Sequence, residues 1–130
     1  MPSERPMRPV DAYKLIIDQL VERSPSLGAR LVAEDGIYSK APALQPLNAL
    51  VERLTPEDRA LLVQMLEHER FSAIHDVLAA ITWWIDCRDV ALTYKGEPMP
   101  VQLSGMGLHG DYVGRKDNWE WPEAEDGEQA

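Results

Sequence analysis

The chain has 130 residues, of which 45% are hydrophobic and 27% are charged, and its formal net charge is −9. This composition is typical of one globular domain and excludes an intrinsically disordered chain. The longest apolar run, from Val77 to Ile85, is too short to cross a bilayer as a helix, and the N-terminal residues lack the apolar core of a secretory signal. The single cysteine excludes an internal disulfide, so we expect a cytoplasmic protein of bacterial type.

Acidic residues are concentrated in the second half of the sequence. Residues 51–130 carry seven basic and sixteen acidic side chains, whereas residues 1–50 carry six of each. An acidic surface repels phosphate backbones, so direct nucleic-acid binding is disfavoured. The charge fits either solubility alone or an acidic face that meets a basic protein partner, and charge by itself does not separate the two.

The first part of the sequence predicts three helices after a loose arm over residues 1–9. Between Pro9 and Arg23, apolar residues recur at intervals of three and four, which is the period of one helix face. Ser24-Pro25 predicts the start of a short second helix through Leu31, and the sequence around Gly36 predicts a turn. A third helix is expected to open at Pro46.

Thr55-Pro56-Glu57-Asp58 predicts the start of a further helix. The Thr55 hydroxyl can accept the amide of Asp58, Pro56 takes a position that needs no N–H, and the acids complement the positive helix end. A new start at Ser72 predicts a bend and a second helix whose apolar stripe ends at Ile85. The first of these two helices is expected to bury four apolar side chains, Leu61, Leu62, Met65 and Leu66.

Two short strands are predicted after these helices. Val90–Tyr94 and Met99–Leu103 have strand-like composition, and Lys95 to Pro98 between them predicts a hairpin loop. The predicted fold is mainly α: a compact helical bundle of four to five helices with a small C-terminal β-hairpin and a glycine-rich loop. We expect a flexible arm over residues 1–9, a single helical domain with the hairpin over residues 10–122, and a disordered acidic tail over residues 123–130.

The glycine-rich segment Ser104–Arg115 is the strongest pointer to a site, because glycines permit backbone conformations that other residues avoid. Its stretch Gly105–Gly110 satisfies the dinucleotide pattern G-x-G-x-x-G. No βαβ unit surrounds it, however, and the residues that follow open a helix poorly, which favours a turn-rich loop. His109 and Asp111 can form an acid/base pair, with a surface turn capped by Asp111 as the alternative.

Other polar groups give weaker signals. His68 and His75 lie seven residues apart, each followed by an acid, and such a set can ligate a metal. Solvated charges beside the core are the alternative, and we expect no metal and no cofactor. Cys87 lies near a helix C-terminus, which argues against an activated thiol and favours a buried or half-buried structural side chain.

The tryptophans predict packing surfaces. Trp83 and Trp84 project about a hundred degrees apart on a helix, so one can join the core while the other needs a second surface. Trp119 and Trp121 lie in a polar segment and are expected either to pack along the domain, beside Trp84 or Tyr112, or to anchor a partner. Dimerisation through the Trp83-Trp84 face is a further alternative.

The segment from Ile81-Thr-Trp-Trp-Ile-Asp-Cys-Arg88 through Met106-Gly-Leu-His-Gly-Asp-Tyr112 resembles small bacterial proteins of an uncharacterised family, of the domain-of-unknown-function kind. The resemblance covers most of residues 10–122. It implies no activity and supports the bacterial cytosolic setting.

Two functions of different classes follow from the sequence. The first is a small acidic interaction or regulatory module without catalytic activity, which binds a protein partner or a second copy of itself and no membrane. The second is a small-ligand-binding or hydrolytic protein with its site at the glycine-rich loop. No catalytic residue is assigned, and the candidate ligand- or partner-binding residues are Trp84, His109, Asp111, Tyr112, Trp119 and Trp121.

Overall fold

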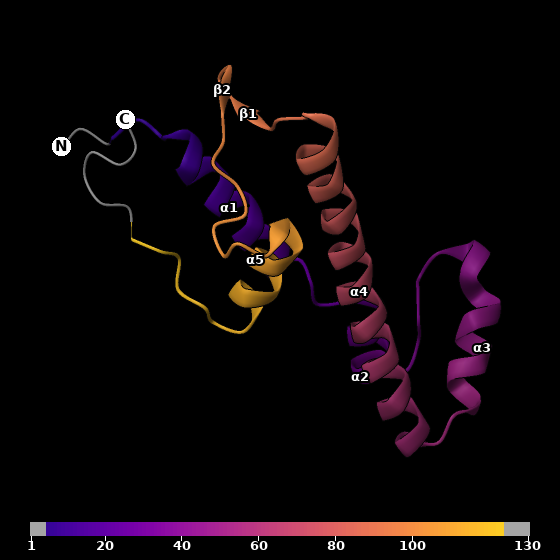
Figure 1. Ribbon diagram of the computed structural model, residues 1–130. Coiled ribbons are helices and arrows are strands. Elements are labelled where there is room, and N and C mark those ends of the chain that lie inside the picture. The colour runs from indigo at the N-terminus through magenta and orange to yellow at the C-terminus, as the bar shows by residue number, and fades with distance from the viewer. Residues whose placement is uncertain (1–4, 124–130) are drawn as a thin grey trace. The chain divides into compact units, whose positions relative to one another are not determined.

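A computed structural model describes residues 5–123 of the chain, and this part is mainly helical (Figure 1). In chain order its elements are α1 (Pro9–Glu22), α2 (Leu27–Asp35), the 3-10 helix η1 (Pro42–Leu44), α3 (Gln45–Arg53), α4 (Pro56–Arg88), β1 (Thr93–Tyr94), β2 (Glu97–Pro98) and α5 (Gly107–Lys116). The predicted class, mainly α with a small hairpin, is confirmed. Among the described residues, no helix combines the length and apolarity that a membrane crossing requires.

The chain divides into two compact units. The first unit contains the described residues up to Val21 and those from His75 onward, and the second is Glu22–Ile74. Residues 5–8 of the predicted arm precede α1 without regular secondary structure. Residues 1–4 of that arm and 124–130 of the predicted acidic tail lie outside the described residues.

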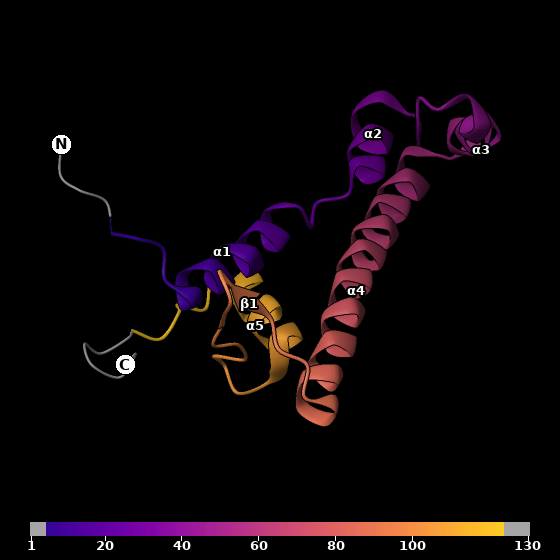
Figure 2. The ribbon, with the colours of Figure 1, turned by 90° about the horizontal axis from the view of Figure 1, so that it is seen from above.

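Helices α1 and α5 lie side by side in the first unit, and their apolar faces form its core (Figures 1 and 2). Tyr13 and Ile17 of α1, and Leu108 and Tyr112 of α5, are each no more than 2% exposed. The spacing of four residues on both helices puts the two members of each pair on one helix face. Burial of each of these side chains stabilises the fold by about 1.5–3 kcal/mol.

The β-hairpin is shorter than predicted, and its turn lies elsewhere. Tyr94 pairs with Glu97, so Lys95 and Gly96 alone form the turn. Both turn residues have positive φ, 51° and 83°, as a type I′ hairpin turn requires. The predicted loop from Lys95 to Pro98 is therefore wrong, because its last two residues form β2.

In the second unit, Ser26 rather than Ser24 begins α2. The Ser26 side chain accepts the amide three residues later at 3.1 Å, and its own amide lies 3.2 Å from both carboxylate oxygens of Glu67. Pro25 therefore precedes the cap instead of opening the helix, which corrects the prediction. Gly36 ends α2 with φ of 68°, and this left-handed conformation matches the predicted turn.

Helix α4 is one continuous helix of 33 residues, so the predicted new helix start at Ser72 is wrong. No glycine or proline follows Pro56 within it, and nothing interrupts the ladder of backbone hydrogen bonds. The predicted start is confirmed, because the Thr55 hydroxyl accepts the Asp58 amide at 3.1 Å.

The predicted burial along α4 is wrong for part of its length. Leu61 and Met65 are 56% and 63% exposed, and Leu62 and Leu66 are half-buried. Apolar residues occupy more than one face of this helix. The spacing of apolar residues alone therefore does not tell which face is buried.

Candidate functional site

Asp111 is a fully buried carboxylate at the centre of the first unit. Its oxygens accept a hydrogen bond from the Tyr13 hydroxyl and one each from the backbone amides of Leu103 and Ser104, both at 2.8 Å. Three donors stabilise a buried negative charge that would otherwise be costly. The carboxylate thereby ties α5 to α1 and to the segment before α5.

Tyr13 is the side chain of α1 that completes this network. It is 1% exposed, and its oxygen also lies 3.4 Å from the Gln102 amide, which donates to it. Burial, reinforced by the hydrogen bond to Asp111 and by the charge of that carboxylate, raises the Tyr13 pKa well above its ordinary value of 10.0. The phenol therefore remains a hydrogen-bond donor at neutral pH.

Thr82, a buried threonine of α4, binds the N-terminus of α5. The Thr82 hydroxyl accepts the amide of Leu108 at 3.0 Å and donates to the carbonyl of Leu78 at 2.8 Å. Gly107, which opens α5, has φ of 83°, and a Cβ there would lie 2.4 Å from the His109 ring. Glycine is required at this position on both grounds.

The predicted turn-rich loop is wrong from Gly107 onward, because Gly107–Lys116 form α5. The alternative of Asp111 capping a surface turn is also wrong, since that residue is buried within the helix. A dinucleotide site is not supported either: β2 ends at Pro98, well before the glycines, and Thr82 already occupies the Leu108 amide.

His109 and Asp111 do not form the predicted acid/base pair. Residues two apart on a helix project about 200° apart, so their side chains point in different directions. The Nδ1 atom of His109 lies 3.5 Å from the Thr82 hydroxyl, and the His109 ring meets the ring of His75 edge-on, with 5.0 Å between centroids. Tyr112, a further predicted site residue, is fully buried in the core.

Trp119 and Trp121 pack within the first unit, which is the intramolecular alternative of the sequence prediction. The Nε1 atom of Trp121 donates to Asp18 of α1 at 3.1 Å, and its ring lies 6.0 Å from that of Tyr13. The two indoles meet each other edge-on at 5.3 Å. Gly114 permits the close approach of Trp119, because a Cβ there would lie 3.1 Å from that ring.

Arg115 fastens this C-terminal segment to α1. Its guanidinium donates to Asp18 at 2.7 Å and to the carbonyl of Trp119 at 2.5 Å, and it lies 5.2 Å from the centre of the Trp121 ring. A planar guanidinium suits this role, since it pairs with a carboxylate and stacks on an aromatic ring together.

Trp83 and Trp84 occupy a different environment, on the surface of α4. They are 48% and 52% exposed, and their rings meet edge-on at 5.4 Å. The guanidinium of Arg88 lies 5.6 Å from the Trp83 ring. The expectation that one of the two indoles joins the core is therefore wrong. Cys87 beside them is exposed, which corrects its predicted burial.

The apolar surface of α4 extends beyond the two indoles. Val77 is 60% exposed and Ala80 is exposed as well. Val77, Ala80 and Trp84 follow the helical spacing of three and four residues, so they share one face, with Trp83 at its edge. We call these four residues the indole face.

The described part of the chain places neither His68 nor His75 in a cluster of candidate metal ligands. Within residues 5–123, no three or more His, Cys, Asp or Glu side chains come together as metal ligands would. His75 lies beside Asp76, at 3.3 Å, and His68 beside Ser72, at 3.4 Å.

Three further residues contribute to this site in ways that the sequence pattern did not predict, namely Tyr13, Asp18 and Thr82. Tyr13 and Asp111 are 98 positions apart, and no local pattern links them. Thr82 carried a usable signal, because it is a polar residue inside the apolar stripe of a helix, where a buried hydroxyl needs a partner.

Comparison with known proteins identifies the chain by family but assigns it no activity. Residues 6–123 match the model described as "Family of unknown function (DUF6547)", which confirms the expected membership of an uncharacterised family. No curated protein and no solved structure matches the chain.

Proposed function

The chain belongs to a family of unknown function (DUF6547), and we propose that it is a small protein-interaction module without catalytic activity, which docks through the indole face of α4. The observation that carries this proposal is the exposure of Trp83 and Trp84, at 48% and 52%. Tryptophan is enriched in the central residues of protein interfaces, where a large rigid side chain loses little entropy on binding.

The other predicted binding residues support this choice by being engaged inside the protein. Asp111 accepts three hydrogen bonds, Tyr112 is fully buried, Trp119 and Trp121 pack on one another, and Trp121 also donates to Asp18 of α1. Trp84, by contrast, is a predicted binding residue whose large apolar side chain is exposed to solvent.

The acidic charge of the chain favours a basic partner, although Arg88 adds one positive charge beside Trp83 at the edge of the indole face. Asp76 precedes Val77 on α4, and its side chain is 80% exposed. The chain carries a formal net charge of −9, which attracts basic proteins over a distance of about a Debye length. A partner with an apolar centre and a basic rim would complement this surface. The cytoplasmic setting expected from the single cysteine belongs to the same proposal.

Photo-crosslinking in the host cell tests the docking surface. A photoreactive amino acid at Val77 is expected to give a protein adduct, while the same group at Lys95, exposed on the hairpin, gives none. Trp84→Ala should abolish the adduct at Val77, because loss of a central tryptophan weakens binding by about 2 kcal/mol or more. Light scattering on the purified chain then tells whether a second copy is the partner. A monomeric chain without an adduct at Val77 contradicts the proposal.

Charge reversal provides a matched pair of variants. Asp76→Lys is expected to weaken partner binding and to reduce its dependence on salt, because this acid borders the indole face. Glu97→Lys places the same change on the exposed hairpin and should leave binding unaltered. Equal effects of the two variants would show that net charge alone, and no particular face, governs association.

A second candidate function, a small-ligand or hydrolytic site, is favoured by the histidine pair. His75 and His109 are both half-buried and lie ring to ring, and the His109 ring also lies beside the Thr82 hydroxyl, so two imidazoles come together there. A ligand at this place would shift the imidazole NMR signals of both residues together. Unchanged signals across a panel of metal ions and metabolites would remove this candidate.

A further inference from the structure

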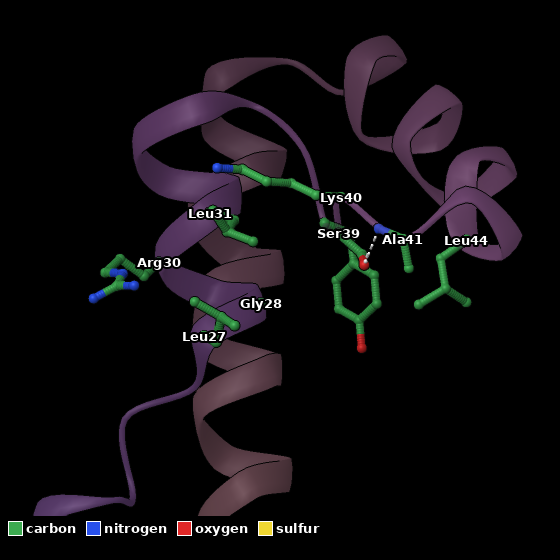
Figure 3. A pocket seen from close by; sticks show the side chains of 9 residues that line it. Leu27, Gly28, Arg30, Leu31, Ser39, Lys40, Ala41 and Leu44 are labelled. Atoms are coloured by element: carbon green, nitrogen blue, oxygen red, sulfur yellow. Dashed lines mark hydrogen bonds between the residues drawn. The ribbon is translucent and has the colours of Figure 1, made fainter.

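The second unit contains a surface pocket of about 500 Å³ between α2 and the segment that leads to α3 (Figure 3). Its walls are largely apolar, formed by Leu27 and Leu31 of α2 and by Leu44 of η1. The lining also includes the Tyr38 side chain and the polar residues Arg30 and Lys40. The volume lies within the range of about 300–1,000 Å³ that small-ligand sites occupy, and the lining is mainly apolar.

The wall opposite α2 is held in place by Asn48 of α3. The Asn48 side chain accepts the amides of Tyr38 at 2.7 Å and Ser39 at 3.0 Å, and it donates to the Ser39 carbonyl at 2.7 Å. These three hydrogen bonds fix the backbone of Tyr38 and Ser39 in the absence of any ligand. A preformed pocket binds more tightly because less ordering is left to the binding step.

Gly28 sets the distance between the two walls. A Cβ at this position would lie 2.7 Å from the Tyr38 ring, so glycine allows that ring to rest directly on α2. The Tyr38 ring then forms a rigid, flat side of the pocket, suited to an aromatic or branched aliphatic group.

The charges of the pocket are opposite to the charge of the chain as a whole. Arg30 and Lys40 line it, no Asp or Glu does, and the chain carries a formal net charge of −9. Both basic side chains are exposed, and neither makes an ion pair or a side-chain hydrogen bond within residues 5–123. In Figure 3 the Lys40 side chain extends over Leu31, whereas Arg30 projects from α2 on the side away from Ser39 and Leu44. Two free cations beside an apolar wall are complementary to an anion with an apolar body.

We infer that this pocket binds a small amphipathic carboxylate, whose apolar body packs against Leu27, Leu31 and Tyr38 and whose carboxylate pairs with Lys40, while Arg30 at the edge of the pocket adds to the positive potential. The inference goes beyond the proposed function, because the pocket lies in the second unit and the indole residues Trp83 and Trp84 lie in the first. Either can fail while the other stands.

An NMR titration of the full chain with phenylacetate tests the inference, with phenylacetamide as a neutral probe of the same shape. Phenylacetate is expected to shift the amide signals of Leu31, Tyr38 and Ser39 in a saturable way, with a dissociation constant of about 1–10 mM for a ligand of this size. Phenylacetamide is expected to bind at least about fivefold more weakly, because it lacks the charge.

Two double variants separate the pocket charges from charge in general. Arg30→Gln with Lys40→Gln should weaken phenylacetate binding about fivefold or more and reduce its salt dependence. Lys14→Gln with Arg53→Gln removes the same charge away from the pocket and should bind phenylacetate as the wild type does. Absence of saturable shifts in the pocket, equal binding of the two probes, or an unaffected Arg30/Lys40 variant would each overturn the inference.

Discussion

Replacement of Asp111 by asparagine should destabilise the protein far more than most conservative changes do. Asparagine keeps the shape of the side chain but turns one acceptor oxygen into a donor, which then faces either the Ser104 amide or both the Tyr13 hydroxyl and the Leu103 amide. At least one buried donor is left without an acceptor, and the remaining hydrogen bonds lose their charge. We expect a loss of about 3 kcal/mol, since a hydrogen bond to a charged group contributes about 1.5–3 kcal/mol and an unpaired buried donor costs about 1–3 kcal/mol. Such a loss is a large fraction of a total stability of about 5–15 kcal/mol.

A double-mutant cycle with Tyr13→Phe isolates the interaction between the two side chains. The single variant should cost about 2 kcal/mol, and the coupling between Tyr13 and Asp111 should amount to about 1–3 kcal/mol. Urea unfolding followed by circular dichroism measures the free energies. Amide exchange at Leu103 and Ser104 reports the local change, which should be faster in the Asp111→Asn variant.

Asp11→Asn is the matched control for this prediction. Asp11 forms an ion pair with Arg8 on the surface of α1, at 3.0 Å, and exposed pairs of this kind contribute at most about 1 kcal/mol. The reasoning is refuted if Asp111→Asn costs no more than Asp11→Asn, or if the cycle gives no coupling.

Three further changes have defined outcomes. Above pH 10 the unfolded chain releases the Tyr13 proton while the folded chain keeps it, because burial raises the pKa of Tyr13 in the folded state. Stability should therefore fall by up to about 1.4 kcal/mol per pH unit, and Tyr13→Phe should reduce this slope in alkaline urea titrations. Gly114→Ala places a Cβ 3.1 Å from the Trp119 ring, so the variant should lose about 1 kcal/mol of stability and its tryptophan emission should shift to the red. Unchanged emission would argue against the packing of Trp119 on Gly114. Thr55→Ala removes the acceptor of the Asp58 amide and should cost about 1 kcal/mol in thermal unfolding, while Thr55→Ser should retain most of it.

Local patterns in the sequence were sufficient to predict two features of the helices, the range of α1 and the start of α4. α1 follows from the spacing of its apolar residues, and its observed range, Pro9–Glu22, matches the predicted one closely. The start of α4 follows from Thr55 and Pro56, because a cap acts on the amides within the next turn. Such features depend on neighbours in the sequence, so no tertiary information is needed to find them.

Features that depend on distant residues could not be predicted in this way. α5 contains three glycines and has no side-chain cap of its own, so its sequence favours a loop. Thr82, which lies 26 positions earlier, accepts the Leu108 amide, and buried Asp111 binds Tyr13 on α1. These tertiary contacts outweigh the weak local helix preference.

The candidate site likewise depends on contacts between residues that are distant in the sequence. The pairing of His109 with Asp111 looked plausible from their spacing, yet in a helix that spacing separates the two side chains. The exposure of Trp83 and Trp84 was equally hidden, because an apolar pattern on α4 does not tell which apolar face is covered. The pocket beside Gly28 left no motif in the sequence, since its walls come from α2 and from a segment without regular structure.

The most direct test of the docking proposal is the solvent exposure of the individual indoles, measured by fluorine NMR on protein labelled with 5-fluorotryptophan. In the free chain, a soluble paramagnetic agent should broaden the signals of Trp83 and Trp84 much more than those of Trp119 and Trp121. In the complex with the crosslinked partner, or in the dimer if the chain pairs with itself, the first two signals should become protected and the other two should stay unchanged. Protection of Trp119 and Trp121 instead, or continued exposure of Trp83 and Trp84 in the complex, would contradict the proposed docking surface.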